Sequence, residues 1–183
     1  MSNIVKRHNL PSTKNTPVDS DLVLADISSS MGTILDSSTT CYSCLIDALN
    51  TQKAISIDGF ATKIFPVKSA NDLPMPHGST NLTDALLYAI ECHPMGVLVV
   101  SDGAPDNRET ALEAATQLSN ECIVNVLYIG PDVPMNKIFM RELAEAGRGR
   151  YSEYDIVAER SAKLLGSSIA SLLMLPPPTT IEL

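Results

Sequence analysis

The stretch that decides the fold is Leu22-Val23-Leu24-Ala25-Asp26-Ile27-Ser28-Ser29-Ser30-Met31. It begins with four apolar residues and then turns acidic and hydroxyl-rich. A short apolar run bounded by polar residues predicts a strand that is buried on both faces of a parallel sheet. The carboxyl end of such a strand is where an open α/β sheet places its ligands. We therefore expect Asp26, Ser28 and Ser30 to converge on one point in a loop at that end.

Two later segments carry the same kinds of side chain. Gly78-Ser79-Thr80-Asn81-Leu82 places a hydroxyl before an expected helix, and Val99-Val100-Ser101-Asp102-Gly103 ends an apolar run with a second aspartate. Hydroxyl and carboxylate oxygens are hard ligands, which suit Mg²⁺ or Mn²⁺ better than a soft metal. An aspartate that ends a buried strand also needs a partner for its charge. The sequence therefore favours a cation site built from several segments.

These three segments together resemble a known family. Asp26-x-Ser28-x-Ser30 resembles the DxSxS motif of von Willebrand factor A (vWA) domains, and Gly78–Leu82 is similar to the loop that carries the isolated threonine of that family. The segment Val99–Gly103 is similar to its strand-end SDG. Their order matches the metal-ion-dependent adhesion site (MIDAS), and the resemblance covers residues 20–173. It implies a metal site whose members are Asp26, Ser28, Ser30, Thr80 and Asp102.

The resemblance also implies a function. Mg²⁺ would be the cation, with Mn²⁺ or Ca²⁺ as alternatives, and an Asp or Glu side chain of a partner protein would complete its octahedral shell of oxygens. In the family, the hydroxyls bind directly, whereas the aspartates often act through water. Intracellular vWA domains work beside AAA+ ATPases or within larger complexes. We therefore expect a non-enzymatic adaptor that presents a client to such a partner, with a structural or assembly subunit as the alternative.

The periodicity of the whole chain predicts a doubly wound, mostly parallel α/β sheet with helices on both faces. The resemblance implies six strands in the order 3-2-1-4-5-6 with one antiparallel edge strand. Asn81 is expected to cap a helix from Leu82 to about Pro94, and Asp106 with Glu109 to open another. The expected strands are 21–26, 53–60, 63–67, 97–100, 122–129 and 151–154, and the other helices are 41–51, 134–146 and 156–173.

Length and composition limit the remaining possibilities. The 183 residues suit one cored domain at 20–174, between a flexible arm at 1–19 and a Pro-rich tail at 175–183. A net charge of −8 without blocks of like charge argues against nucleic-acid and anionic-membrane partners. The first ten residues are followed by no apolar signal region, and no apolar run approaches the roughly 18 residues of a membrane span. These features predict a cytoplasmic protein.

Other functional classes fit the sequence less well. A haloacid-dehalogenase-type phosphatase would use Asp26, Thr80 and Asp102, but its chemistry needs a second aspartate as general acid where Ser28 stands. A dinucleotide site would need three glycines in the first turn, which has only Gly32. The CxxC at Cys41–Cys44 has no second pair of ligands for zinc, so we expect the four cysteines to be free structural thiols.

Overall fold

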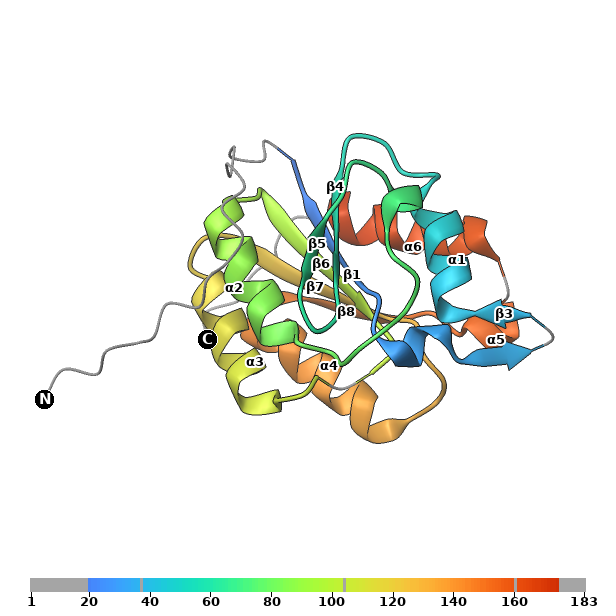
Figure 1. Ribbon diagram of the computed structural model, residues 1–183. Helices are drawn as coiled ribbons and strands as arrows, with labels where there is room; N and C mark the ends of the chain where they lie inside the picture. Colours follow the sequence, from blue (N-terminus) through green and yellow to red (C-terminus); the bar gives the residue numbers. More distant parts are fainter. Residues whose placement is uncertain (1–19, 37, 104, 160, 175–183) are drawn as a thin grey trace, which may run out of the picture.

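A six-stranded sheet forms the centre of the molecule (Figure 1). The computed structural model describes residues 20–36, 38–103, 105–159 and 161–174, so the predicted arm at 1–19 and tail at 175–183 lie outside the described residues. In spatial order the strands are β5 (Ile64–Pro66), β4 (Ser56–Phe60), β1 (Leu22–Asp26), β6 (Gly96–Ser101), β7 (Ile123–Tyr128) and β8 (Arg148–Glu153). All neighbours pair in parallel except β4 and β5. This arrangement confirms the expected order 3-2-1-4-5-6 and the antiparallel edge strand.

The central strand β1 supplies side chains to a core on each face of the sheet. Leu22 and Leu24 pack in one cluster, and Val23 and Ala25 pack in the other. Their alternation follows from the two-residue period of a strand. All five residues of β1 are buried, which explains why its sequence is an unbroken apolar run rather than an alternating one.

Helices cover both faces of the sheet. On one face lie α2 (Leu82–Cys92), α3 (Arg108–Leu118) and α4 (Pro134–Ala146), and on the other lie α1 (Cys41–Leu49) and α6 (Ala162–Met174) (Figure 1). The first three supply apolar residues to the cluster that holds Leu22 and Leu24, whereas α1 and α6 contact each other over the second cluster. The predicted helices before residue 150 therefore exist, with ends within a few residues of the expected ones.

Two local predictions were wrong. The expected polar turn through Thr40 contains a small hairpin of β2 (Ile34–Asp36) and β3 (Thr39–Thr40), and the 3-10 turn η1 (Ser29–Gly32) precedes it. Strands this short are too brief for a two-residue period to show in the sequence. In addition, the expected edge strand at 151–154 begins earlier, at Arg148, directly after the helix cap Gly147.

The expected last helix at 156–173 is broken into α5 (Ile156–Glu159) and α6. The Tyr154 hydroxyl explains the break, because it donates to the Ser161 carbonyl at 2.7 Å and accepts from the Ser161 N–H at 2.9 Å. The Ser161 hydroxyl then accepts from the Leu164 N–H at 3.3 Å, which begins α6. The tyrosine hydroxyl thus takes the Ser161 N–H that a continuous helix would have bonded to a backbone carbonyl, whereas the Ser161 carbonyl still accepts from the Leu165 N–H at 3.0 Å.

The four cysteines are free thiols, as expected. Cys41 is buried, and its thiol donates to the Ile129 carbonyl at 3.4 Å, which joins the start of α1 to the end of β7. Burial raises the pKa of Cys41 to about 12, so this group stays protonated. Within the described residues, no helix has both the length and the apolar character needed to cross a membrane.

Candidate metal site

Asp26 ends β1 and is the most buried member of the candidate site, with 0% of its surface exposed. Its Oδ1 accepts from the Ser28 backbone N–H at 2.7 Å, and its Oδ2 accepts from the Ser101 hydroxyl at 2.6 Å. Burial raises the pKa of Asp26 to about 6, against these two hydrogen bonds, which lower it. The nearby Asp102 charge adds to the rise. Asp26 is therefore a carboxylate whose negative charge is poorly compensated by the protein itself.

A row of three side-chain oxygens lies beside Asp26. The Ser28 and Ser30 hydroxyl oxygens are 3.0 Å apart, and the Ser30 hydroxyl donates to Asp102 Oδ1 at 2.8 Å. Ser28 and Asp102 are buried, whereas Ser30, which lies between them in the row, is exposed, so the row reaches the surface at Ser30. Burial also raises the pKa of Asp102. Four of the five predicted site residues are thus brought together at the carboxyl ends of the adjacent strands β1 and β6.

Thr80 reaches this end of the sheet through a loop before α2. The His77 N–H donates to the Ile27 carbonyl at 2.9 Å, and the Ser29 N–H donates to the Gly78 carbonyl at 3.1 Å. These two bonds hold the loop against the one that carries Ser28 and Ser30. Thr80 itself is buried, but within the described residues no hydrogen bond joins its hydroxyl to the other four side chains.

Asp106 has a different role from the one we expected. The residue that caps α3 is Asn107, whose side chain accepts from the Thr110 N–H. Asp106 instead accepts from the Thr80 N–H at 3.1 Å, and its own N–H donates to the Thr80 carbonyl at 3.0 Å. Asp106 therefore clamps the backbone of Thr80. Both Asp and Asn favour cap positions, so the capping pattern alone does not distinguish the two neighbours.

Ser101 is the site residue that the sequence analysis did not identify. Ala25 of β1 pairs with Val100 of β6. The next residues of the two strands, Asp26 and Ser101, therefore lie side by side at the strand ends. The signal was present as the hydroxyl that precedes Asp102 in the SDG segment. The role of Ser101 depends on the residue-by-residue register of β1 and β6, which the sequence alone does not predict.

We predict that Asp106→Ala loosens the Thr80 loop and that Asp106→Asn does not. Alanine removes the acceptor for the Thr80 N–H, whereas asparagine keeps an oxygen at the same place. In the alanine variant, hydrogen exchange at the Thr80 amide should be about tenfold faster, the effect of losing one ordinary hydrogen bond. Equally fast exchange in both variants would show that the carboxylate acts through its charge instead, and wild-type exchange in both would contradict the clamp.

The donor set fits a small hard cation. With Mg–O distances of 2.0–2.1 Å, neighbouring corners of an octahedron are about 3.0 Å apart, and the hydroxyl oxygens of Ser28 and Ser30 are separated by 3.0 Å. A cation would also compensate the two buried carboxylates. Among the described residues, no three His, Cys, Asp or Glu side chains gather into a metal-binding group, because this site contains only two acids and its other oxygens are hydroxyls.

The same geometry is unsuited to phosphoryl transfer by Asp26. A nucleophilic carboxylate must reach its substrate, but Asp26 is fully buried and both of its oxygens accept hydrogen bonds. The neighbouring position of a general acid holds the Ser28 hydroxyl, which does not titrate near neutral pH. The phosphatase alternative therefore has no chemical basis in this arrangement.

Comparison with known proteins places the fold. Neither a family model nor a curated protein sequence matches the chain. The crystal structure of the SpRpn10 VWA domain is similar, with a TM-score of 0.56 and 11% sequence identity over 84% of this chain and 95% of that chain. The response regulator domain of Thermotoga maritima CheB covers 87% of this chain and 99% of its own, with 16% identity and a TM-score of 0.48. Together with the sheet order, the first similarity shows that this chain has the fold of a vWA domain.

Proposed function

We propose that the protein is a Mg²⁺-dependent protein-interaction module. The observation that carries the proposal is the row of Ser28, Ser30 and Asp102 oxygens, which lies beside the buried Asp26 and reaches the surface at Ser30. A cation held there would present an open coordination position to solvent. The carboxylate of an Asp or Glu on a partner protein is the side chain best suited to fill it.

The residues would divide the work according to their burial and charge. Ser28, Ser30 and Thr80 would hold the cation, since their neutral hydroxyls leave it enough positive charge to attract another carboxylate. Asp26 and Asp102 would balance that charge, and Asp26 would also fix the Ser28 backbone through its Oδ1. When bound, the cation supplies electrostatic attraction for an acidic side chain and no redox chemistry. Recognition rather than turnover follows from this division.

The resemblance favours a role as an adaptor that presents a client to an AAA+ ATPase. A permanent structural or assembly subunit is the alternative, and the two differ in how much protein is free. Size-exclusion chromatography of native extract separates them, since an adaptor elutes partly as the monomer and a structural subunit elutes only with its complex.

Thermal unfolding in Mg²⁺ and in EDTA tests the site directly. A ligand at 100 times its dissociation constant stabilises the folded state by about 2.7 kcal/mol. For a domain of this size, we predict that Mg²⁺ raises the Tm by roughly 5–10 °C. Ser30→Ala should lose the rise, because it removes an exposed ligand from the row.

Ser29→Ala is the matched control for this measurement. Ser29 is an exposed serine in the same turn η1 but is not part of the oxygen row, so its variant should keep the full Mg²⁺ response. Loss of the response in both variants, or in neither, would contradict the assignment of Ser30. Partner capture that persists equally in Mg²⁺ and in EDTA would contradict the proposed function.

A further inference from the structure

A cavity of about 380 Å³ lies beside the candidate metal site. Its volume is within the range of roughly 300–1,000 Å³ that is typical of ligand pockets. Ser30 and Asp102 line it, so the cavity and the oxygen row share two residues. The other side chains that line it come from two segments. Thr33 and Leu35 lie just before and within β2, and Pro131 and Asn136 lie before and within α4.

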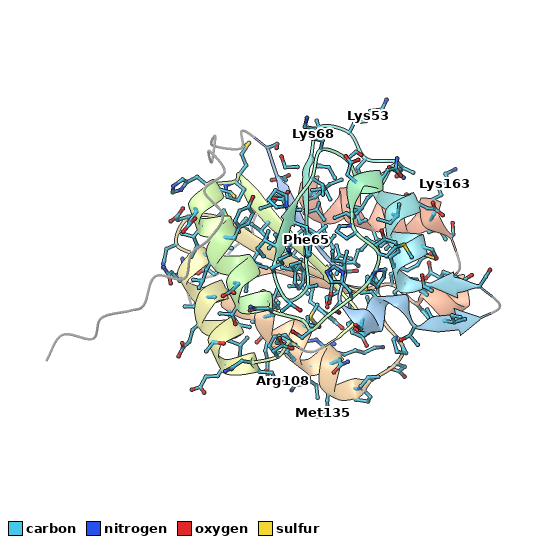
Figure 2. The ribbon with its side chains drawn as sticks, viewed as in Figure 1. Lys53, Phe65, Lys68, Arg108, Met135 and Lys163 are labelled. Carbon is cyan, nitrogen blue, oxygen red and sulfur yellow. The ribbon has the colours of Figure 1, made fainter. Side chains whose placement is uncertain are left out.

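Two apolar side chains, Leu35 and Pro131, line this cavity. Leu35 is also partly buried against the core. Beside these walls, Ile34 of β2 is 67% exposed and Met135 of α4 is 57% exposed. Figure 2 shows Met135 next to Arg108, whose guanidinium donates to the Met135 carbonyl at 3.0 Å and so ties the first turn of α4 to α3. Leu35 and Pro131 therefore give the cavity an apolar part directly beside Ser30 and Asp102.

We propose that this cavity receives an aliphatic side chain of the partner, from a residue adjacent to the acidic one. This inference rests on the proposed function, because it takes the metal site as the anchor. A partner carboxylate at Ser30 and Asp102 would lie at the mouth of the cavity, and consecutive residues are only 3.8 Å apart along a chain. The side chain next to the carboxylate is therefore the one that lies at this cavity, which Leu35 lines.

Charge decides the chemistry of that second side chain. None of the described residues that line the cavity is a lysine or arginine, and Asp102 contributes a negative charge to its wall. A second acidic residue would therefore be repelled, and a basic one would compete with the cation. An aliphatic residue such as Leu, Ile, Met or Val fits the Leu35 and Pro131 walls without either cost.

An array of acetylated hexapeptides tests the inference. Each peptide carries one fixed Glu in an Ala background, and the residues on either side of it are varied. The protein is applied in Mg²⁺ and in EDTA. We expect binding only in Mg²⁺ and only with the Glu present, and peptides with an adjacent Leu, Ile, Met or Val should bind about 10- to 100-fold more tightly than those with Ser.

Three variants assign the preference to the cavity. Leu35→Ala should weaken the preference for Leu over Ser by about fourfold or more, the effect of one or more lost methylene contacts. Thr33→Gln fills the exposed mouth of the cavity without removing core atoms, so it should have the same effect even if Leu35→Ala is poorly folded. Leu87→Ala, at an exposed leucine of α2 outside the cavity, should leave the preference unchanged.

The outcomes separate this inference from the proposed function. Glu-dependent binding in Mg²⁺ without any aliphatic preference would overturn the inference and leave the proposed function standing. An aliphatic preference that survives in both Leu35→Ala and Thr33→Gln would also overturn it. Binding that is equal in Mg²⁺ and EDTA, or no binding to any peptide, would overturn both.

Discussion

The variant Asp26→Asn is expected to stabilise the metal-free protein at neutral pH by about 3 kcal/mol. The wild-type carboxylate is fully buried, and burial raises its pKa from 3.8 to about 6. At pH 7 the ionised Asp26 therefore has a higher free energy in the folded protein than in the unfolded chain, which lowers the free energy of unfolding. Asparagine keeps an oxygen for the Ser28 N–H, and its amide group can donate to the Ser101 hydroxyl.

This effect has a defined pH window. Because the pKa of Asp26 is raised in the folded state, folding binds a proton between pH 3.8 and about 6. The stability that Asp26 contributes is complete below the unfolded pKa of 3.8 and is lost as the pH rises through 6. The difference between Asp26→Asn and wild type should therefore be small near pH 4 and reach its full value above about pH 7.

Urea unfolding followed by circular dichroism, in EDTA from pH 4 to pH 8, measures this difference. In Mg²⁺ the order should reverse or the gap should close, because only the wild type gains from the cation. Asp58→Asn is the control: Asp58 is also a buried carboxylate with raised pKa, but it binds Tyr88 and Val67 in another part of the sheet. That variant should keep the Mg²⁺ response. A less stable Asp26→Asn in EDTA at pH 7.5 would refute the charge argument.

The variant Gly130→Ala is expected to disturb both stability and the metal site. A Cβ at Gly130 would lie 2.5 Å from the Asp102 carbonyl oxygen and 2.9 Å from the Asp102 Cα. Backbone atoms cannot turn aside as a flexible side chain does, so either Asp102 or the start of the loop to α4 must move. Overpacking of this kind typically costs about 1–3 kcal/mol, and occasionally more. Because Asp102 accepts from Ser30, its displacement should also abolish most of the Mg²⁺ response.

Gly103→Ala provides a matched control next to the same aspartate. A Cβ at Gly103 would meet only the Asn136 side-chain nitrogen, at an ordinary distance of 3.5 Å. Chemical denaturation and the Mg²⁺-dependent rise in Tm should therefore be near wild type for Gly103→Ala and strongly changed for Gly130→Ala. Similar losses in the two variants would mean that the region tolerates no added carbon, and the specific contact with Asp102 would lose its support.

The sequence predicted the parts of the site that depend on strand ends. Asp26 and Asp102 each follow a buried apolar run, and parallel strands direct their carboxyl ends to one edge of a sheet. With the strand order that the resemblance implied, the two aspartates were expected at neighbouring strand ends, and in the structure Ser30 links this pair by its hydrogen bond to Asp102. The roles of two residues could not be predicted from strand ends. That of Ser101 depends on the register of β1 and β6, and Asp106 contacts Thr80, a residue 26 positions earlier.

The elements that the sequence did not predict are those decided by single contacts. The break between α5 and α6 is made by the hydroxyl of Tyr154, which acts on Ser161 from outside the helical segment. Periodicity continues across this point, because apolar residues on both sides face the same core. The hairpin of β2 and β3 likewise has no sequence pattern of its own, and its second strand contacts α1.

The central position of β1 has a consequence for synthesis on the ribosome. Among the described strands of the sheet, β1 comes first in the sequence, yet its partners are β4 and β6, and the second of these ends only at Ser101. At translation rates of about 5–20 residues per second, β1 waits roughly 4–15 s for its last neighbour. During that interval its apolar residues have no complete sheet to enter, so chains that stall before β6 are the ones most exposed to aggregation and to capture by chaperones.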